Sequence, residues 1–165
     1  MEVANAEGAT LKAHSLLAAF RQQNKVIVHI QHISTRENAT FFLPNTRGIE
    51  IHKSVLPLPH EKIISKHFPN SFRDTDLEEF LQENGVQEII FCGMMSHMCI
   101  DATVRAAFDK GYTCIVADDA CATRNLTHNE VEVQSTHVQA SFMAALAAVY
   151  ARVTPTAQII AEITM

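Results

Sequence analysis

The sequence predicts an α/β fold with three layers, α/β/α, around a mostly parallel sheet. Helical and strand-like segments alternate along nearly the whole chain, which is the pattern of right-handed βαβ units. The strand-like segments are short, continuous apolar runs, as expected of parallel strands buried on both faces. The chain has 165 residues, 47% of them hydrophobic and 19% charged, which is the balance of one globular domain. We therefore expect a single domain over residues 1–165.

The first half of the chain contains two predicted helices and two predicted strands. Apolar residues at helical spacing predict a helix over 8–24, and the run KVIVHIQHI predicts a strand over 25–33. Prolines and a glycine without periodicity indicate a loop over 34–59, and loops of this length are usually functional or disordered. A short strand over 62–66 and a helix over 74–84 follow.

The second half alternates between strands and helices. The predicted strands cover 87–92, 112–117 and a short piece at Val153, and the predicted helices cover 98–110, 134–150 and 156–163. Functional side chains of such sheets gather at the carboxyl ends of the strands. Those ends hold Gln31 and His32, Lys66, the segment 93–99, and the segment 118–123.

Composition excludes several classes of function. The net charge is −5 and no basic cluster occurs, so we expect no nucleic-acid partner. No apolar run approaches the roughly 20 residues of a membrane helix, and no secretory signal opens the chain. We therefore expect a cytoplasmic protein without a membrane partner. The four cysteines form no Cys-x-x-Cys pair, which argues for free thiols in a reducing compartment.

The strongest local signal is the segment FCGMMSHMC at 91–99. A strand ends at Gly93, Ser96 is placed to N-cap the next helix, and Cys99 would lie in the first turn of that helix. A helix N-terminus favours the thiolate, and its free amides can hold an oxyanion. This is the setting of a nucleophilic cysteine, although a core cysteine at a helix start has the same pattern.

Lys66 ends the predicted strand 62–66. A lysine in this position is more often a solvated strand end. In the functional interpretation, its ammonium lies near a thiolate and a developing oxyanion, and it stabilises both.

Three blocks together carry a family resemblance. Lys66 with HFPNSF at 67–72, CGMMSHMCIDAT at 92–103 and ADDACATR at 117–124 resemble the isochorismatase-like cysteine hydrolases. That superfamily includes nicotinamidases, N-carbamoylsarcosine amidohydrolases and streptothricin hydrolases. The resemblance extends from the first helix to the last and implies a parallel sheet with helices on both faces, in agreement with the alternation of elements.

The resemblance also implies a mechanism without a cofactor. Cys99 matches the nucleophile and Lys66 the catalytic lysine. The bond between Met94 and Met95 matches a non-proline cis peptide, which places the amides of Met95 and Cys99 in an oxyanion hole. The implied reaction is hydrolysis of an amide-type C–N bond in a small molecule through a thioester.

One family feature is absent from the sequence. The family's third catalytic residue is an aspartate at the end of a first, central strand, whereas this chain opens with MEVANAEG, which resembles the loop after that strand. We therefore expect an N-terminally truncated domain that lacks the first strand, and no general base can be named. The alternative function is a catalytically inactive, oligomeric member that binds a small molecule.

No metal site is expected. His29 and His32 stand three residues apart on a strand and so point to opposite faces, which prevents them from converging on one ion. The turn over 93–96 also lacks the glycine pattern of a dinucleotide site.

The remaining site candidates have two interpretations each. His97 either binds substrate or caps a helix. Phe41, Phe68 and Phe72 either line an apolar substrate pocket or pack their loops onto the body. By resemblance we expect a homo-oligomer, a dimer or tetramer, for which the alanine-rich helix 134–150 is a candidate contact surface.

Overall fold

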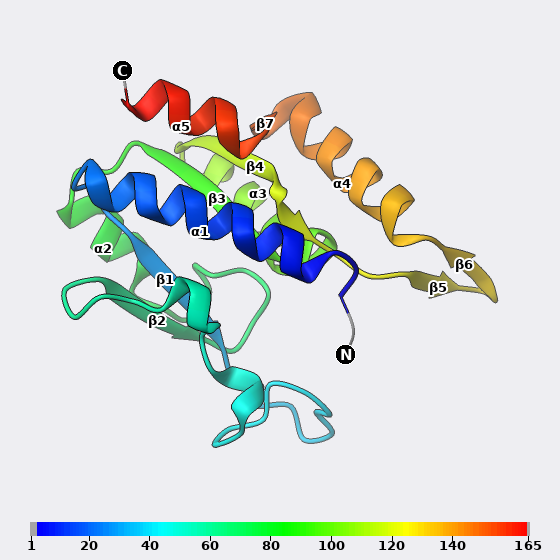
Figure 1. Cartoon of the computed structure of the whole chain (residues 1–165). Helices are drawn as coiled ribbons and strands as arrows, with labels where there is room; N and C mark the ends of the chain where they lie inside the picture. The colour runs from blue at the N-terminus through cyan, green and yellow to red at the C-terminus, as the bar shows by residue number, and fades with distance from the viewer. Residues whose placement is uncertain (1–2, 165) are drawn as a thin grey trace.

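The computed structural model describes residues 3–164, so Met1, Glu2 and Met165 lie outside the described residues. Five parallel strands form its centre. They are β1 (Val28–His32), β2 (Lys62–Lys66), β3 (Glu88–Met94), β4 (Thr113–Ala122) and β7 (Arg152–Thr154). Helices cover both faces of these strands (Figure 1), so the predicted α/β/α arrangement is confirmed.

The helices divide between the two faces. One face carries α1 (Ala6–Gln22) and α5 (Thr156–Thr164), which contact each other, and the other carries α3 (Asp101–Asp109) and α4 (Ser135–Val149). The short helix α2 (Leu77–Glu83) packs on Ile64 of β2. Within residues 3–164, no helix is both long enough and apolar enough to cross a membrane.

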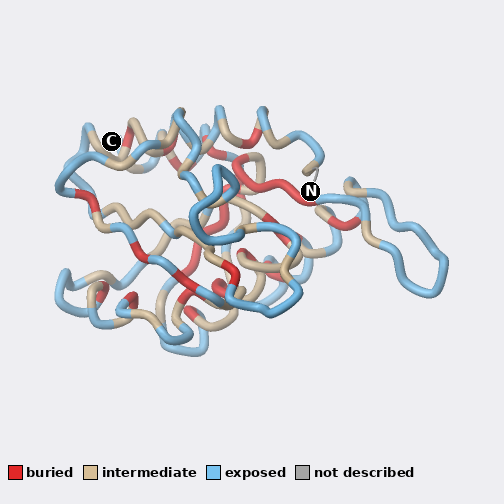
Figure 2. The backbone as a smooth tube through the Cα atoms, turned by 90° about the horizontal axis from the view of Figure 1, so that it is seen from below, coloured by how far each residue is buried: buried red, intermediate tan, exposed pale blue. Residues whose placement is uncertain are grey.

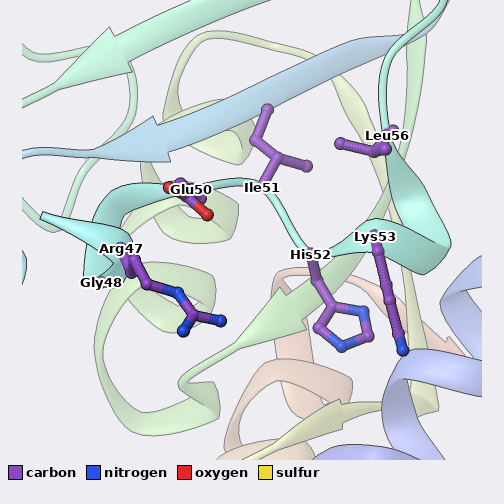
Figure 3. A pocket seen from close by; sticks show the side chains of 7 residues that line it. All are labelled: Arg47, Gly48, Glu50, Ile51, His52, Lys53 and Leu56. Carbon is purple, nitrogen blue, oxygen red and sulfur yellow. The ribbon is translucent and has the colours of Figure 1, made fainter.

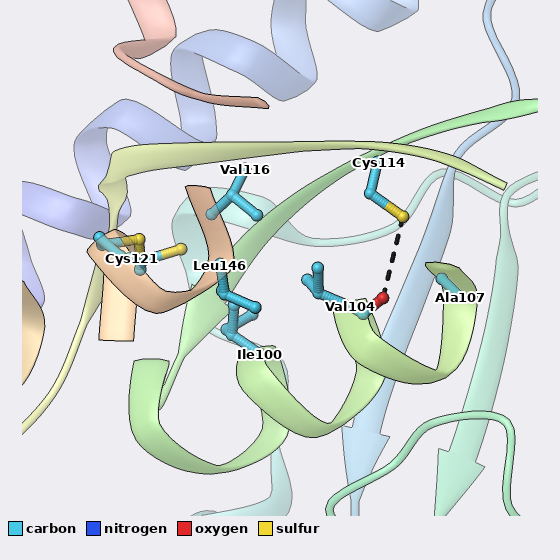
Figure 4. Packing of buried hydrophobic residues seen from close by; sticks show 8 residues of the cluster. Ile100, Val104, Ala107, Cys114, Val116, Cys121 and Leu146 are labelled. Carbon is cyan, nitrogen blue, oxygen red and sulfur yellow. Dashed lines mark hydrogen bonds between the residues drawn. The ribbon is translucent and has the colours of Figure 1, made fainter. Parts of the chain in front are cut away.

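Strand β4 separates the two halves of the core because its side chains alternate between the faces. Cys114, Val116 and Cys121 pack with Val104 and Leu146 under α3 and α4 (Figure 4). The residues between them in the chain face α1 and α5: Ile115, Ala117 and Ala120. Val116, Ala117 and Ala120 of β4 are fully buried, so this strand is the centre of the hydrophobic core.

The parallel strands form two sheets instead of the single sheet that we predicted. Strands β1 and β2 pair with each other, and β3, β4 and β7 form the second sheet in the order β3–β4–β7. Among the described residues, no hydrogen-bonded ladder joins the two sheets.

Strand β4 is longer than the sequence predicted. It continues through Asp118 and Asp119 because a shift in its pairing with β3 lets it go on to pair with Gly93 and Met94. The predicted strand end at Asp118–Asp119 is therefore wrong. Asp119 caps the start of α5, where its Oδ1 accepts hydrogen bonds from the amide (2.7 Å) and hydroxyl (2.6 Å) of Thr156.

A β-hairpin was not predicted. Strands β5 (Leu126–His128) and β6 (Val131–Val133) pair in antiparallel fashion and project from the body as an exposed arm (Figures 1 and 2). The turn residues Asn129 and Glu130 both have positive φ, 48° and 64°. The turn contains no glycine, the residue that usually marks a two-residue hairpin loop, so no local pattern predicted the hairpin.

The loop over 34–59 contains two short 3₁₀ turns, Arg47–Ile49 and Lys53–Val55. Side chains from the body hold it in place through its carbonyls. Gln31 Nε2 donates to Ile49 O (2.7 Å) and Arg21 Nη2 donates to Leu56 O (2.7 Å). The loop is therefore ordered over the carboxyl end of β1.

Candidate active site

Lys66 is the last residue of β2, and its side chain is buried, with an exposed fraction of 2% for the whole residue. Its Nζ donates to Ser71 Oγ (3.0 Å) and to the carbonyl of Pro69. Burial lowers the pKa of Lys66 from its ordinary value, and the neighbouring Cys99 thiol acts in the opposite direction. Lys66 is therefore not the solvated strand end that is usual for its position.

A chain of hydroxyl groups connects Lys66 to the helix that follows Cys99. Ser71 Oγ lies 3.0 Å from Thr103 Oγ1, and the Ser71 amide donates to the same oxygen (3.1 Å). Both Ser71 and Thr103 are buried. The Lys66 ammonium is consequently held from two sides, by its own loop and by α3.

Cys99 lies in a π-helical turn, Ser96–Ile100, that runs directly into α3. The carbonyl of Met95 accepts hydrogen bonds from the amides of Met98 (3.0 Å) and Ile100 (3.3 Å). These donors stand on either side of Cys99 in the chain. Cys99 is half-buried, whereas Cys114 and Cys121 are buried in the core.

The helix start differs from the prediction in one respect. The helical segment begins at Ser96, two residues before the predicted start, and the N-cap position falls on Met95. Ser96 is therefore inside the helix, and its hydroxyl bonds to Gln139 of α4. The peptide bond between Met94 and Met95 is cis.

His97 bonds to the end of the neighbouring strand. Its Nδ1 lies 2.5 Å from Thr123 Oγ1, and its ring lies edge-on to Phe142 with 6.1 Å between centroids. Burial, and secondly the charge of Arg124, lower the pKa of His97, so the neutral ring is favoured at pH 7. A role for His97 in substrate binding stays a prediction.

The three predicted pocket aromatics have different surroundings. Phe72 stacks on Tyr112 with 6.1 Å between ring centroids and packs against the core, so packing accounts for it. Phe68 lies under the guanidinium of Arg73, 3.6 Å from the ring centroid. Phe41 is exposed on the long loop against Phe42. A pocket role remains a prediction for Phe41 and Phe68.

His29 and His32 have separate environments. His29 Nε2 lies 2.8 Å from Glu61 Oε2, whereas the His32 ring packs on Phe42 with 5.3 Å between centroids. The buried Nδ1 of His32 has no hydrogen-bond partner within the described residues. In that same part of the chain, no three His, Cys, Asp or Glu side chains are grouped as metal ligands.

Two hollows lie near the long loop. The larger, about 730 Å³, is lined by loop residues alone (Figure 3): Arg47, Gly48, Glu50, Ile51, His52, Lys53 and Leu56. The smaller, about 230 Å³, lies between α1 and the ends of β3 and β4 and includes Met94 in its lining. Neither Cys99 nor Lys66 lines either hollow.

A buried lysine beside a cysteine, at the carboxyl ends of parallel strands, is the arrangement that the three sequence blocks imply. The profile of the Isochorismatase domain matches residues 1–158. The chain belongs to the isochorismatase family. Its members are hydrolases, and amidases occur among the relatives of this chain.

Several isochorismatase-family proteins are similar over much of the chain. The family protein YddQ of Bacillus subtilis is 53% identical over 156 residues, which cover 94% of this chain and 87% of YddQ. A streptothricin hydrolase of Streptomyces noursei is 35% identical over 111 residues, which cover 67% of this chain and 43% of that enzyme. A solved structure of an isochorismatase from Pseudomonas putida has 34% identity and a TM-score of 0.88, over 95% of this chain and 80% of that one.

Sequence reasoning missed three parts of this candidate site. They are the Ser71–Thr103 bridge, the π-helical turn and the contact of Gln139 with Ser96. Ser71 and Thr103 belong to two of the blocks that carry the resemblance, so their presence was visible but their contact was not. Gln139 stands inside an alanine-rich helix, where a single glutamine has no distinguishing pattern.

Proposed function

We propose that the chain is a cysteine-dependent hydrolase that cleaves an amide-type C–N bond of a small molecule through a thioester. Cys99 is the nucleophile and Lys66 the cation beside it. The observation that carries the proposal is the burial of the Lys66 ammonium next to the Cys99 thiol. Charged lysines are almost never fully buried without an anionic partner. A thiolate at Cys99 provides that anion.

The reaction proceeds in two displacements. The sulfur of Cys99 forms a bond to the carbonyl carbon, and the carbonyl oxygen becomes an oxyanion that the amides of Met95 and Cys99 hold. The C–N bond then breaks, the nitrogen leaves with the proton lost by the thiol, and a thioester remains. Water adds to the thioester carbon, the C–S bond breaks, and a carboxylic acid and the free thiol are formed.

The local geometry supports the role of the Cys99 amide. In an ordinary α-helix, the amide of Cys99 would donate to the carbonyl of Met95. Here the amide of Ile100 makes that bond instead, so the bond does not use the amide of Cys99. The similarity to streptothricin hydrolase favours an amide-type substrate.

Selective alkylation tests the nucleophile. Iodoacetamide at pH 7, followed by peptide mass spectrometry, should modify Cys99 well before Cys114 and Cys121, because the thiolate is the reactive species. Cys92 is an exposed residue, but desolvation raises the pKa of its thiol to about 11, so it serves as the unactivated internal control. Equal rates at Cys92 and Cys99 would contradict an activated nucleophile.

Turnover provides the second test. Ammonia or amine release from a panel of small primary amides and N-carbamoyl compounds should be detectable in the wild type and absent in Cys99→Ala. The melting temperature of Cys99→Ala should change little, because the side chain is only half-buried. A large fall in melting temperature would favour a core role for this cysteine.

A non-catalytic, ligand-binding member is the second candidate. It is favoured by one observation: within residues 3–164, no carboxylate is among the hydrogen-bond partners of Lys66. In that case Cys99 would react with iodoacetamide but no amide of the panel would be hydrolysed, while some of the same compounds would raise the melting temperature.

We further propose a cytoplasmic location and a homo-oligomer. The outward side of α4 is exposed and consists mainly of alanines, which permits close packing of a second copy: Ala140, Ala144, Ala145, Ala147 and Ala148. Sedimentation equilibrium tests this, and a monomer at micromolar concentration would refute the oligomer.

A further inference from the structure

We infer that Gln139 of α4 is a positioning residue of the proposed active site, which fixes the π-helical turn of Cys99 to the end of β4. The inference rests on the proposed role of Cys99 as nucleophile. Gln139 is not among the residues that contact Lys66 in the structure, so it would act through Ser96.

The side-chain amide of Gln139 bridges two elements. Its Oε1 accepts a hydrogen bond from Ser96 Oγ at 2.5 Å, and its Nε2 faces the carbonyls of Asp118 (3.1 Å) and Cys121 (3.5 Å). An amide has two N–H donors and one carbonyl, so all three of its polar directions are in use. One side chain therefore links the nucleophile turn to the carboxyl half of β4.

Ser96 is the residue through which this link reaches the nucleophile. It is fully buried and is the first residue of the π-helical turn. Its hydroxyl has one hydrogen, and the contact with Gln139 is shorter than the alternative contact with Ala122 O (3.2 Å). Cys99 follows within the same turn, so a displacement of Ser96 also moves the thiol and the Cys99 amide.

The turn needs an external anchor for physical reasons. π-Helical bonding is rare and occurs as single turns, frequently at functional sites. Here the N-cap residue Met95 provides no side-chain hydrogen bond to the turn. Two side-chain contacts replace it: Ser96 with Gln139, and His97 with Thr123. The first contact connects the start of the turn to α4, and the second connects it to the residue that follows β4.

Positioning of this kind has a measurable effect on reactivity. A misplacement of about 1 Å at a reacting group can cost up to 100-fold in rate. Gln139→Leu keeps the approximate volume but removes the amide, and Ser96→Ala removes the other half of the same hydrogen bond. Because both variants break the same Ser96–Gln139 bond, their effects on Cys99 should be strongly non-additive in the double variant.

The experiment measures the second-order rate of Cys99 alkylation by iodoacetamide from pH 6 to 9, together with melting temperature. We expect Gln139→Leu and Ser96→Ala each to slow alkylation at pH 7 by at least about tenfold, and the double variant to be no slower than either. Ser96→Thr, which keeps the hydroxyl, should restore most of the rate. Gln158→Leu is the matched control, since this exposed glutamine on α5 bonds to Thr154 and Glu162.

Two results would overturn the inference. One is a fall in melting temperature for Gln139→Leu with an unchanged rate and pH profile at Cys99, which would make the residue purely structural. The other is additive effects of Ser96→Ala and Gln139→Leu. If Gln139→Leu does not fold, the comparison of Ser96→Ala with Ser96→Thr decides the question. Failure of this inference can be distinguished from failure of the proposed function. If Cys99 is not the nucleophile, alkylation of the wild type is already unselective, before any variant is made.

Discussion

Glu61 is a buried carboxylate with several hydrogen-bond donors around it, and its replacement by glutamine gives a quantitative prediction. Its side chain is 2% exposed and accepts four hydrogen bonds of 2.8 Å each. Two come from Arg21 of α1, one from His29 of β1 and one from the amide of Leu58. The carboxylate therefore joins a helix, a strand and the end of the long loop.

The magnitude follows from linkage between ionisation and folding. The Arg21 guanidinium, followed by the Leu58 amide and His29, lowers the pKa of Glu61 from 4.5 to about 2 against the opposing effect of burial. At about 1.4 kcal/mol per pH unit, the ionised form contributes about 3 kcal/mol to the free energy of unfolding at pH 7. The folded-state pKa is depressed, so this contribution is present above about pH 4.5 and is lost as the pH falls towards 2.

Urea denaturation of the wild type and Glu61→Gln at several pH values tests the prediction. The variant should lose about 3 kcal/mol at pH 7, which corresponds to roughly 6–12 °C in melting temperature for a chain of this size, and less at pH 3.5. Glu78→Gln is the control, because its ion pair with Lys110 is exposed and should contribute less than about 1 kcal/mol. A difference between wild type and Glu61→Gln that does not change between pH 7 and 3.5 would refute the electrostatic reasoning.

Three further variants test other parts of the structure. Lys66→Met replaces a buried ammonium by an apolar chain of similar length, so it should slow Cys99 alkylation at pH 7 by at least about tenfold without lowering the melting temperature; an unchanged rate would count against the pair. Thr103→Val leaves the buried Ser71 amide without its acceptor and should cost about 1–3 kcal/mol in urea denaturation, and no loss would show that the bridge is dispensable. Leu146→Ala opens a cavity in the core and should cost about 2–5 kcal/mol, whereas Leu11→Ala, at a residue that is 59% exposed, should cost less than about 0.5 kcal/mol; similar losses would contradict the burial argument.

Most of the fold was predictable because its signals are local. Each of the five parallel strands overlaps a predicted apolar or β-branched run, and each helix lies within or close to its predicted range. Boundaries were wrong where tertiary pairing decided them. Strand β4 continues past the polar pair Asp118–Asp119 because its later residues pair with the end of β3. No pattern within β4 itself predicts this continuation.

The candidate site was only partly predictable, for a different reason. Cys99 and Lys66 belong to recognisable blocks at strand ends, so their roles could be proposed from sequence. Their supports could not be, because Thr103 meets Ser71 across 32 residues and Gln139 meets Ser96 across 43. Hydroxyl and amide side chains are common, and their spacing does not reveal which distant pairs meet.

The two ends of β2 carry buried charges with different surroundings. Glu61 stands directly before β2, and two basic side chains and a backbone amide surround it, so burial of its charge stabilises the fold. Lys66 ends the same strand and is also buried, but a carbonyl and a hydroxyl are its hydrogen-bond acceptors in the described chain. Neutral oxygens do not cancel a buried charge, so the Lys66 ammonium costs stability unless an anion forms beside it. Cys99 is the neighbouring group that can form one, and a thiolate there is what the proposed reaction requires.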